Sequence, residues 1–207
     1  MPNDSITCGR QWPLPNLTQE QKEKILEASQ KIGAYMKQNK YKGFFGLDFI
    51  IEENTNKIFV SECNARFTAS TPFYTSLELK EDEIPLIAYH IAAFLGIRLP
   101  HKIMTKCTGT QIIVRNNQAA KVKINNNLLS GTYIYKGNNI QFINDNYEVN
   151  KLKPKEFIIL PQRPDKLVDT NEEIARIELI EEVVTGSQLK NNIKNIIDIL
   201  RKKLLVK

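Results

Sequence analysis

The sequence predicts an α+β fold: an antiparallel sheet with packed helices, followed by a strand-rich C-terminal subdomain that ends in a helix. Three observations predict it. A capped segment near residues 18–39 repeats apolar residues every three or four positions, residues 44–64 alternate with a period of two, and strand-like runs dominate after residue 105. For 207 residues we expect two domains, 1–99 and 100–207.

Composition places the chain among ordinary globular proteins. Apolar residues make up 42% and charged residues 25%, which excludes a disordered or collagen-like chain. No apolar run approaches the roughly 18 residues of a membrane span, and the first residues lack the basic and apolar pattern of a secretory signal. Three cysteines without a C-x-x-C pair argue against a disulfide framework or a zinc site. We therefore expect a cytoplasmic protein with reduced thiols.

The net charge of +6 arises in the second half of the chain, because residues 1–100 are nearly balanced. The basic residues there are interspersed with Asn, Gln and Glu and lack interleaved aromatic residues. This pattern favours a solvated surface over a nucleic-acid groove, so we do not expect a nucleic-acid partner.

The first half of the chain contains the clearest local signals. The first sixteen residues, which are rich in proline, predict an extended arm or an edge strand. A T-x-x-Q capping pattern at Thr18 begins a helix that should end near Asn39. Residues 44–51 and 57–64 predict a β-hairpin. Two helices are expected after it, over residues 72–79 and 82–95, and the second should end at Gly96.

The second half predicts strands that end in a helix. Ser187 is the expected cap of the final helix, in which Leu189 begins an inward-facing apolar stripe. Residues 136–139 predict a hairpin turn. The expected strands span residues 110–115, 121–124, 131–135, 140–143, 156–160 and 177–184.

Two carboxylates should face each other on the first hairpin. With a loop at residues 54–56 and Glu53 opposite Lys57, Asp48 stands opposite Glu62 on the same face. Two carboxylates in such a pair repel by about 3 kcal/mol at an effective dielectric constant near 20. A divalent cation between them would remove this repulsion.

Neighbouring residues extend this site. Asn64 and Arg66 follow Glu62 at two-residue intervals and share its face. Carboxylate and amide oxygens suit Mg²⁺, which usually binds nucleotide phosphates as well, and an arginine suits an adjacent phosphate or carboxylate. Cys63 alternates to the opposite side, where we expect a small buried residue. The alternative is a solvated hairpin face on which these polar residues fall by chance.

These residues resemble a known family. The runs GFFGLDFI (43–50) and FVSECNARF (59–67), with the helix before them, resemble the C-terminal metal-binding hairpin of ATP-grasp enzymes, which include carboxylate–amine ligases, biotin carboxylase and carbamoyl-phosphate synthetase. The resemblance covers residues 16–98. It implies that Asp48, Glu62 and Asn64 hold Mg²⁺ or Mn²⁺ and ATP, and that Arg66 is a catalytic residue that meets the acyl phosphate or carboxylate partner.

The resemblance also implies what is missing. ATP-grasp enzymes normally have a preceding N-terminal lobe with the adenine pocket and a glycine-rich loop, and no phosphate-binding motif in this sequence replaces it. The expected function is the Mg·ATP-binding half of a ligase that activates a carboxylate as an acyl phosphate for attack by an amine. Such a chain would be truncated or split, inactive alone, and completed by an N-terminal lobe in trans or by a homo-oligomer. The alternative is a non-catalytic ATP-grasp remnant that acts as a binding or protein-interaction domain.

Overall fold

The computed structural model describes residues 7–14, 17–52, 54–101, 107–125, 128–185 and 188–205. The chain forms two compact units. We call residues 16–105 the hairpin unit, and residues 1–15 together with 106–207 the sheet unit. Within the described residues, no helix combines the length and the apolar character needed to cross a membrane.

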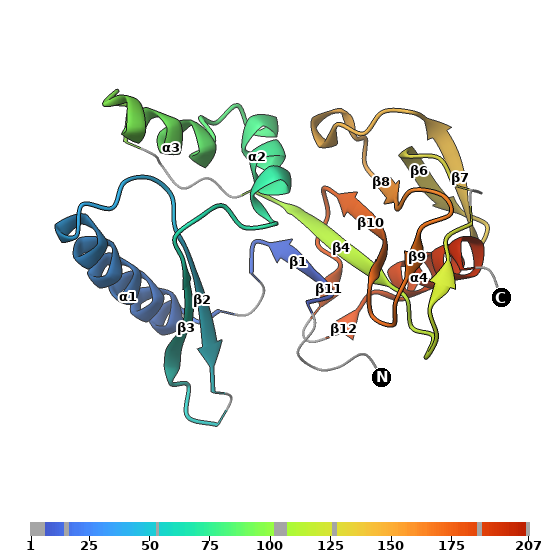
Figure 1. The fold of residues 1–207 in the computed structure, drawn as a ribbon, viewed down its shortest axis with the longest axis horizontal. Helices are drawn as coiled ribbons and strands as arrows, with labels where there is room; N and C mark the ends of the chain where they lie inside the picture. The colour runs from blue at the N-terminus through green and yellow to red at the C-terminus, as the bar shows by residue number, and fades with distance from the viewer. Residues whose placement is uncertain are drawn as a thin grey trace. The chain divides into compact units, whose positions relative to one another are not determined.

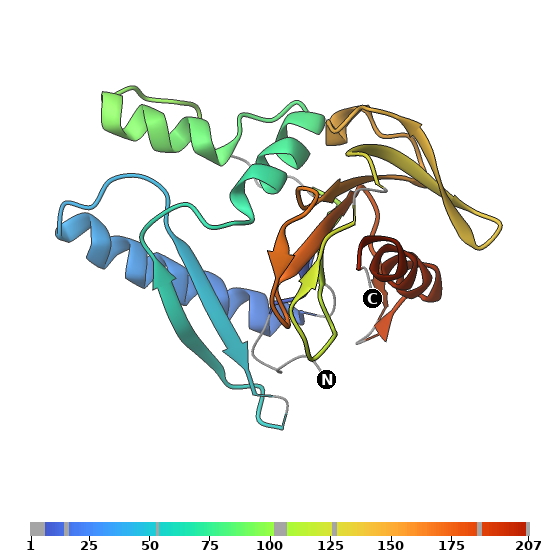
Figure 2. The ribbon, with the colours of Figure 1, turned by 45° about the vertical axis from the view of Figure 1, so that its right-hand side comes forward.

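The hairpin unit begins with a helix that its sequence caps. Thr18 Oγ1 accepts a hydrogen bond from Gln21 N, and Gln21 Oε1 accepts one from Thr18 N, so the predicted capping box is confirmed. The helix lies beside strand β3 in both ribbon views (Figures 1 and 2). The elements of this unit are α1 (Gln19–Gln38), β2 (Gly46–Ile51), β3 (Ile58–Asn64), α2 (Thr71–Lys80) and α3 (Leu86–Leu95).

Strands β2 and β3 pair with a register that changes along their length. Near the turn, Glu52 N donates to Lys57 O at 2.9 Å, so Glu52 is the partner of Lys57. The predicted pairing of Lys57 with the next residue, Glu53, is therefore wrong. A bulge between Asp48 and Phe49 shifts the register by one residue. Beyond it Asp48 lies opposite Glu62, as predicted.

Helix α3 begins later than predicted. Pro85 is its N-cap, and Asp82 before it has a φ of 56°, which a helix does not allow. The buried Glu78 of α2 fixes this start, because its Oε2 accepts a hydrogen bond from Leu86 N at 3.0 Å. Gly96 ends the helix in the left-handed conformation with a φ of 71°, as expected.

The sheet unit is built on a six-stranded antiparallel sheet with the strand order β1-β4-β10-β8-β6-β7. The predicted edge strand is confirmed, since β1 pairs with β4. The elements are β1 (Gly9–Trp12), β4 (Gly109–Arg115), β5 (Val122–Lys123), β6 (Gly131–Lys136), β7 (Asn139–Asn144), the 3-10 helix η1 (Val149–Lys151), β8 (Glu156–Pro161), β9 (Leu167–Val168), β10 (Glu173–Leu179), β11 (Val184–Thr185), β12 (Gln188–Leu189) and α4 (Asn191–Leu204).

Two predicted boundaries in this unit are wrong. The strand expected over 177–184 is β10, which begins at Glu173 and ends at Leu179. The final helix begins at Asn191 with Lys190 as its N-cap, whereas Leu189 lies in β12, paired with Val184. The expected cap at residue 187 lies outside the described residues.

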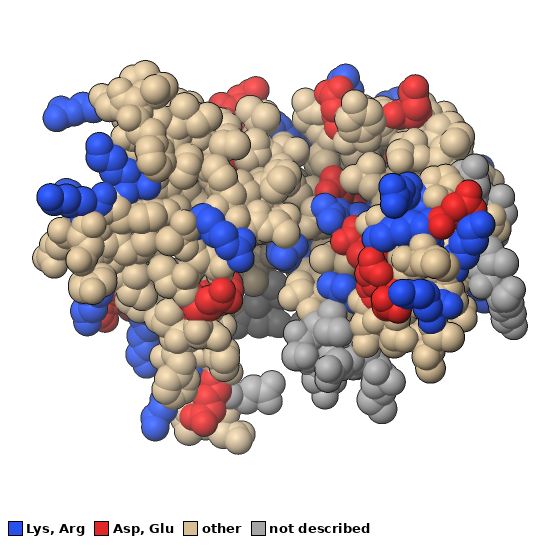
Figure 3. Space-filling model, in the orientation of Figure 1, with Lys and Arg blue, Asp and Glu red and all other residues tan. Residues whose placement is uncertain are grey.

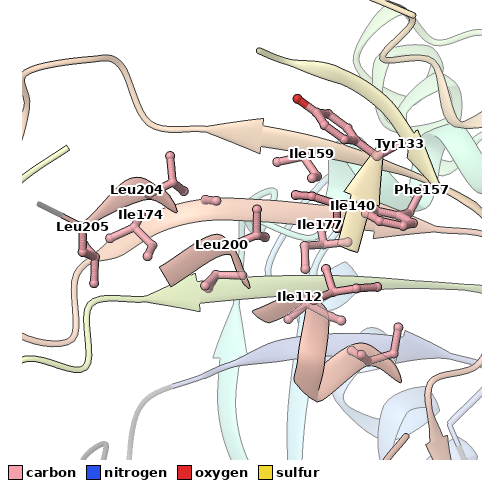
Figure 4. Close-up of a cluster of buried hydrophobic side chains, with 14 of the residues drawn as sticks. Ile112, Tyr133, Ile140, Phe157, Ile159, Ile174, Ile177, Leu200, Leu204 and Leu205 are labelled. Atoms are coloured by element: carbon pink, nitrogen blue, oxygen red, sulfur yellow. The ribbon is translucent and has the colours of Figure 1, made fainter. Parts of the chain in front are cut away.

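Helix α4 covers one face of the sheet and completes the core (Figure 4). Its inward residues Ile193, Ile196, Leu200 and Leu204 are at most 4% exposed. They pack in one cluster with residues of the sheet such as Ile112, Ile177 and Ile159, which lie side by side on β4, β10 and β8. The apolar stripe predicted for this helix is therefore present from Ile193 onward.

The same sheet carries a row of polar side chains, of which Gln111 and Glu178 are buried and Arg10 is half-buried. Arg10 Nη1 donates to Gln111 Oε1 at 3.1 Å, and Gln111 Nε2 donates to Glu178 Oε1 at 2.8 Å. These residues are cross-strand partners on β1, β4 and β10. Burial raises the pKa of the Glu178 carboxyl, while the hydrogen bond from Gln111 and the charge of Arg176 oppose this shift.

The raised pKa of Glu178 predicts a decrease in stability with rising pH. Below about pH 4.5, the ordinary value, this carboxyl is protonated in both the folded and the unfolded chain. Above it the unfolded state ionises first, so the free energy of unfolding falls until the folded carboxyl has also ionised. Glu178→Gln should flatten this slope. The test is urea unfolding of both proteins at a series of pH values, monitored by the fluorescence emission of Trp12, the single tryptophan. A slope in Glu178→Gln equal to that of the wild type would contradict the prediction.

Candidate acidic hairpin site

The two candidate carboxylates lie on neighbouring strands of the hairpin unit. Asp48 of β2 and Glu62 of β3 are cross-strand partners, and both side chains are exposed. Cross-strand partners in an antiparallel pair have Cβ atoms about 4.5–5.5 Å apart. The two carboxylates can therefore share one cation that approaches from solvent.

Asn64 adds an amide to this pair. It is 8% exposed, and its Nδ2 donates a hydrogen bond to Asp48 Oδ2 at 3.3 Å. This orientation leaves Asn64 Oδ1 without a hydrogen-bond donor among the described residues. Its cross-strand partner is Gly46, where an added Cβ would lie 3.4 Å from Thr68 Cγ2. The structure thus brings together Asp48, Glu62 and Asn64, as the sequence predicts.

Arg66 lies just beyond the end of β3. Its side chain is exposed, and Nη1 donates to Phe67 O at 3.1 Å. Within the described residues, no ion pair joins it to Asp48 or Glu62. The guanidinium therefore keeps donors that can bind an anion.

The loop after Arg66 leads into helix α2 through hydroxyl contacts. Thr68 N donates to Thr71 Oγ1 at 3.2 Å, and the hydroxyls of Thr68 and Ser70 lie 2.7 Å apart. Phe67 in this loop stacks against Phe44 with ring centroids 5.6 Å apart. These contacts hold the loop that carries the guanidinium.

Cys63 lies on the predicted side of the hairpin but is not buried. Its Sγ lies 4.0 Å from Met36 Sδ of α1, so it faces the helix side of the hairpin as expected. The cysteine is exposed, however, and the expected burial is wrong. Helix α1 covers only part of this face, and Leu47, Phe49 and Ile51 are likewise half-buried.

The structure adds an apolar pair that sequence reasoning missed. Ile50 and Phe59 are cross-strand partners, and they are 57% and 52% exposed. Ile50 follows Asp48 by two residues on β2, so both project from the same face of the hairpin. The sequence places Ile50 on the face of Asp48 through its two-residue spacing, but it contains no signal that this face is uncovered. The carboxylates thus border an exposed apolar pair.

His90 is a structural residue next to this site. Its Nδ1 accepts a hydrogen bond from Phe44 N at 3.0 Å, and its ring contacts Phe67 and Phe94 with centroids 4.4 and 4.9 Å away. Gly43 permits this contact, because its φ is 98° and an added Cβ would lie 2.5 Å from His90 Nδ1. The imidazole therefore connects α3 to the chain entering β2.

Gly43→Ala should destabilise this connection. The substitution combines an unfavourable positive φ with a steric clash, and we expect a loss of about 1–3 kcal/mol in local stability. Gly96→Ala is the matched control, because Gly96 also has a positive φ but an added Cβ meets nothing within 4 Å. Hydrogen exchange of the Phe44 amide should accelerate in Gly43→Ala well beyond its rate in Gly96→Ala. Equal rates would contradict the role given to His90.

Charges of both signs alternate on the sheet unit. Among the described residues of this unit, six ion pairs join lysines and arginines to nearby carboxylates, and basic and acidic side chains intermingle on its visible face (Figure 3). This distribution agrees with the predicted solvated surface. The pairs are Lys121–Asp169, Lys123–Asp165, Lys151–Glu148, Lys166–Glu172, Arg176–Glu173 and Arg201–Asp198.

The donor set at the hairpin decides which metals it could hold. The described part of the chain contains no group of three His, Cys, Asp or Glu side chains placed to hold a metal ion. Two carboxylates and one amide remain, all of them oxygen donors. Mg²⁺ suits such a set, because it binds through one or two carboxylates and completes its shell with water and phosphate oxygens.

Comparison with known proteins supports the fold. The sequence matches no family model and no curated protein. The structure is similar to the crystal structure of N5-carboxyaminoimidazole synthetase from Staphylococcus aureus complexed with ADP, with a TM-score of 0.52 and 14% sequence identity. The match covers 97% of this chain and 43% of the synthetase chain, so this chain spans less than half of that protein's length. The chain therefore has an α+β, ATP-grasp-like fold.

Proposed function

We propose that this chain is the Mg·ATP-binding part of an ATP-grasp ligase. The observation that carries the proposal is the cross-strand pair of Asp48 and Glu62, with Asn64 bonded to Asp48, at the end of a hairpin in an ATP-grasp-like fold. The neighbour with the similar fold was crystallised with ADP, which supports a nucleotide as the ligand. Asp48 and Glu62 are themselves exposed, which suits a ligand that approaches from solvent.

Asp48 and Glu62, together with the amide of Asn64, would hold the metal. When bound, Mg²⁺ would neutralise charge on the nucleotide phosphates. The two carboxylates would balance the charge of the metal, the amide would add one neutral oxygen, and the remaining coordination positions would accept water and phosphate oxygens. Arg66, beyond the strand end, would bind a phosphate or carboxylate oxygen through its guanidinium.

The apolar pair fits the base of the nucleotide. Ile50 and Phe59 lie on the face that carries Asp48, closer to the hairpin turn than Asp48 and Glu62. An aromatic ring favours offset stacking or edge contact with another flat ring. The base would pack on this surface while the phosphates reach the metal.

The reaction proposed for the complete enzyme is transfer of a phosphoryl group from ATP to a carboxylate. The acyl phosphate formed is then attacked by an amine or a similar nucleophile, and phosphate leaves. Phosphoryl transfer depends on positioning and on stabilisation of charge, which both sides of the nucleotide must supply. A second lobe, in trans or from another copy of the chain, would cover the exposed face.

Isothermal titration calorimetry of the whole chain with ATP tests this proposal. We expect binding in the presence of Mg²⁺ and a loss of at least tenfold, about 1.4 kcal/mol, when the metal is replaced by excess EDTA. ATP that binds equally with and without Mg²⁺, or not at all at millimolar concentration, would contradict the proposal.

A non-catalytic role is the second candidate. Helix α3 and the short segment after it expose Ile91, Phe94, Leu95 and Ile97, each more than half exposed. Exposed apolar clusters of this kind mark interaction surfaces. An ATP-grasp remnant that acts as a binding domain would self-associate through such a face without binding Mg·ATP. Light scattering together with the calorimetry separates the two functions.

A further inference from the structure

The sheet unit contains a cavity that the proposed function does not use. It has a volume of about 370 Å³ and lies among β1, β4, β11, β12 and α4. We call it the α4 cavity. Its size falls in the range of about 300–1,000 Å³ typical of small-molecule sites. All of its lining residues belong to the sheet unit, whereas Asp48 and Glu62 belong to the hairpin unit.

The walls of the α4 cavity are apolar. They are formed by branched side chains from three parts of the unit, and most of the lining surface is carbon. Such walls gain free energy by burying hydrocarbon, at about 25 cal/mol for each Å² removed from water. These residues are Ile112, Val114, Val183, Val184, Leu189 and Ile197.

One end of the cavity carries a guanidinium. Arg201 of α4 donates through Nε to Arg115 O at 3.2 Å, which fixes it at the end of β4. Its Nη1 lies 3.7 Å from Asp198 Oδ1, a loose contact, and its Nη2 has no acceptor among the described residues. The side chain is 27% exposed. Arg201 therefore retains donors for an anion that enters the cavity.

A second donor lies toward the opposite end. Gln11 Oε1 accepts hydrogen bonds from Val183 N and Val184 N at 2.7 and 2.8 Å, which fixes the orientation of the amide. Its Nε2 is buried and has no hydrogen-bond partner in the described part of the chain. Gln11 pairs with Thr110, five residues before Arg115 on β4. Five residues of extended strand span roughly 17 Å, so the two ends of the α4 cavity lie about that far apart.

We propose that the α4 cavity binds a carboxylate with a linear apolar chain. The apolar walls accept the chain, the length along β4 suits an extended molecule, and Arg201 pairs with the carboxylate in a charge-assisted hydrogen bond. This site is independent of the acidic hairpin, so its presence or absence does not depend on the proposed ligase function.

Calorimetric titration of the whole chain with octanoate tests the proposal. Octan-1-ol has the same chain without the charge, and acetate has the charge without the chain. Octanoate should bind at least about tenfold more tightly than octan-1-ol, the effect of one charge-assisted hydrogen bond, and acetate should not bind measurably. Equal affinity for octanoate and octan-1-ol, or no octanoate binding at millimolar concentration, would overturn it.

Two pairs of variants locate the binding. Arg201→Gln should weaken octanoate about tenfold or more and leave octan-1-ol unchanged, whereas Lys202→Gln, the same charge change one residue on, should have no effect. Ile197→Phe should fill the cavity and abolish binding of both ligands. Ile199→Phe is its control, because Ile199 packs on the core but does not line the cavity.

Folding of each variant is checked independently by circular dichroism and Trp12 emission. The two pairs act through different chemistry, so the proposal stays testable if one variant fails to fold. Octanoate that binds folded Arg201→Gln and folded Ile197→Phe as tightly as the wild type would show that it binds elsewhere, and would overturn the assignment to the α4 cavity.

Discussion

Replacing Glu62 by Gln should abolish Mg²⁺-dependent binding of ATP. The substitution keeps the shape of the side chain but removes one of the two charges that face each other across β2 and β3. A hard divalent cation then loses half of the negative charge at its site. We expect ATP affinity in the presence of Mg²⁺ to fall at least about a hundredfold, which corresponds to roughly 2.7 kcal/mol. Calorimetry with Mg·ATP measures this, and Asp48→Asn should behave in the same way.

Glu52→Gln is the matched control for this prediction. Glu52 lies on the same hairpin and is exposed, and its substitution makes the same change in net charge, but it pairs with Lys57 near the turn. Its affinity for Mg·ATP should equal that of the wild type. If Glu52→Gln weakened binding as much as Glu62→Gln, the effect would be one of overall charge, and the acidic pair would not be the site.

The second large effect is expected in the core of the sheet unit. Leu200 of α4 is fully buried in the cluster that joins this helix to the sheet (Figure 4). Leu200→Ala should lower the free energy of unfolding of this unit by about 2–5 kcal/mol, through lost burial and the cavity left behind. Urea unfolding followed by Trp12 emission reports on this unit, because the only tryptophan of the chain lies in β1.

Leu129→Ala provides the comparison for Leu200→Ala. Leu129 belongs to the same unit and is 65% exposed, and the hydrogen bond that it accepts from Tyr133 uses its backbone carbonyl. Its substitution should change stability by less than about 0.5 kcal/mol. Similar losses in the two variants would contradict the packing of α4 described above.

The parts of the fold that the sequence predicted are set by local chemistry. The helix start at Thr18 depends on contacts within three residues, and the hairpin turn near Asn138 depends on the positive φ that Gly137 and Asn138 adopt. The opposition of Asp48 and Glu62 was predicted, although the pairing register next to the turn was not. The bulge beside Asp48 shifts the register by one residue and so brings the two acids opposite each other.

The parts that the sequence did not predict depend on distant contacts. Leu189 fits the apolar period of α4, yet it pairs with Val184 in a short strand, and periodicity alone does not separate these structures. Cys63 alternates to the correct side, but its burial depends on how far α1 extends over the hairpin. The apolar pair of Ile50 and Phe59 was missed because alternation does not tell which face of a hairpin is left uncovered.

Paramagnetic broadening by Mn²⁺ tests the central claim most directly. Amide signals of the ¹⁵N-labelled chain are recorded while Mn²⁺ is added in substoichiometric steps with ATP present. The account predicts that Asp48, Glu62 and Asn64 broaden first, ahead of Glu52 on the same hairpin and of the Lys123–Asp165 pair in the sheet unit. Uniform broadening of exposed carboxylates, or none at Asp48 and Glu62, would contradict it.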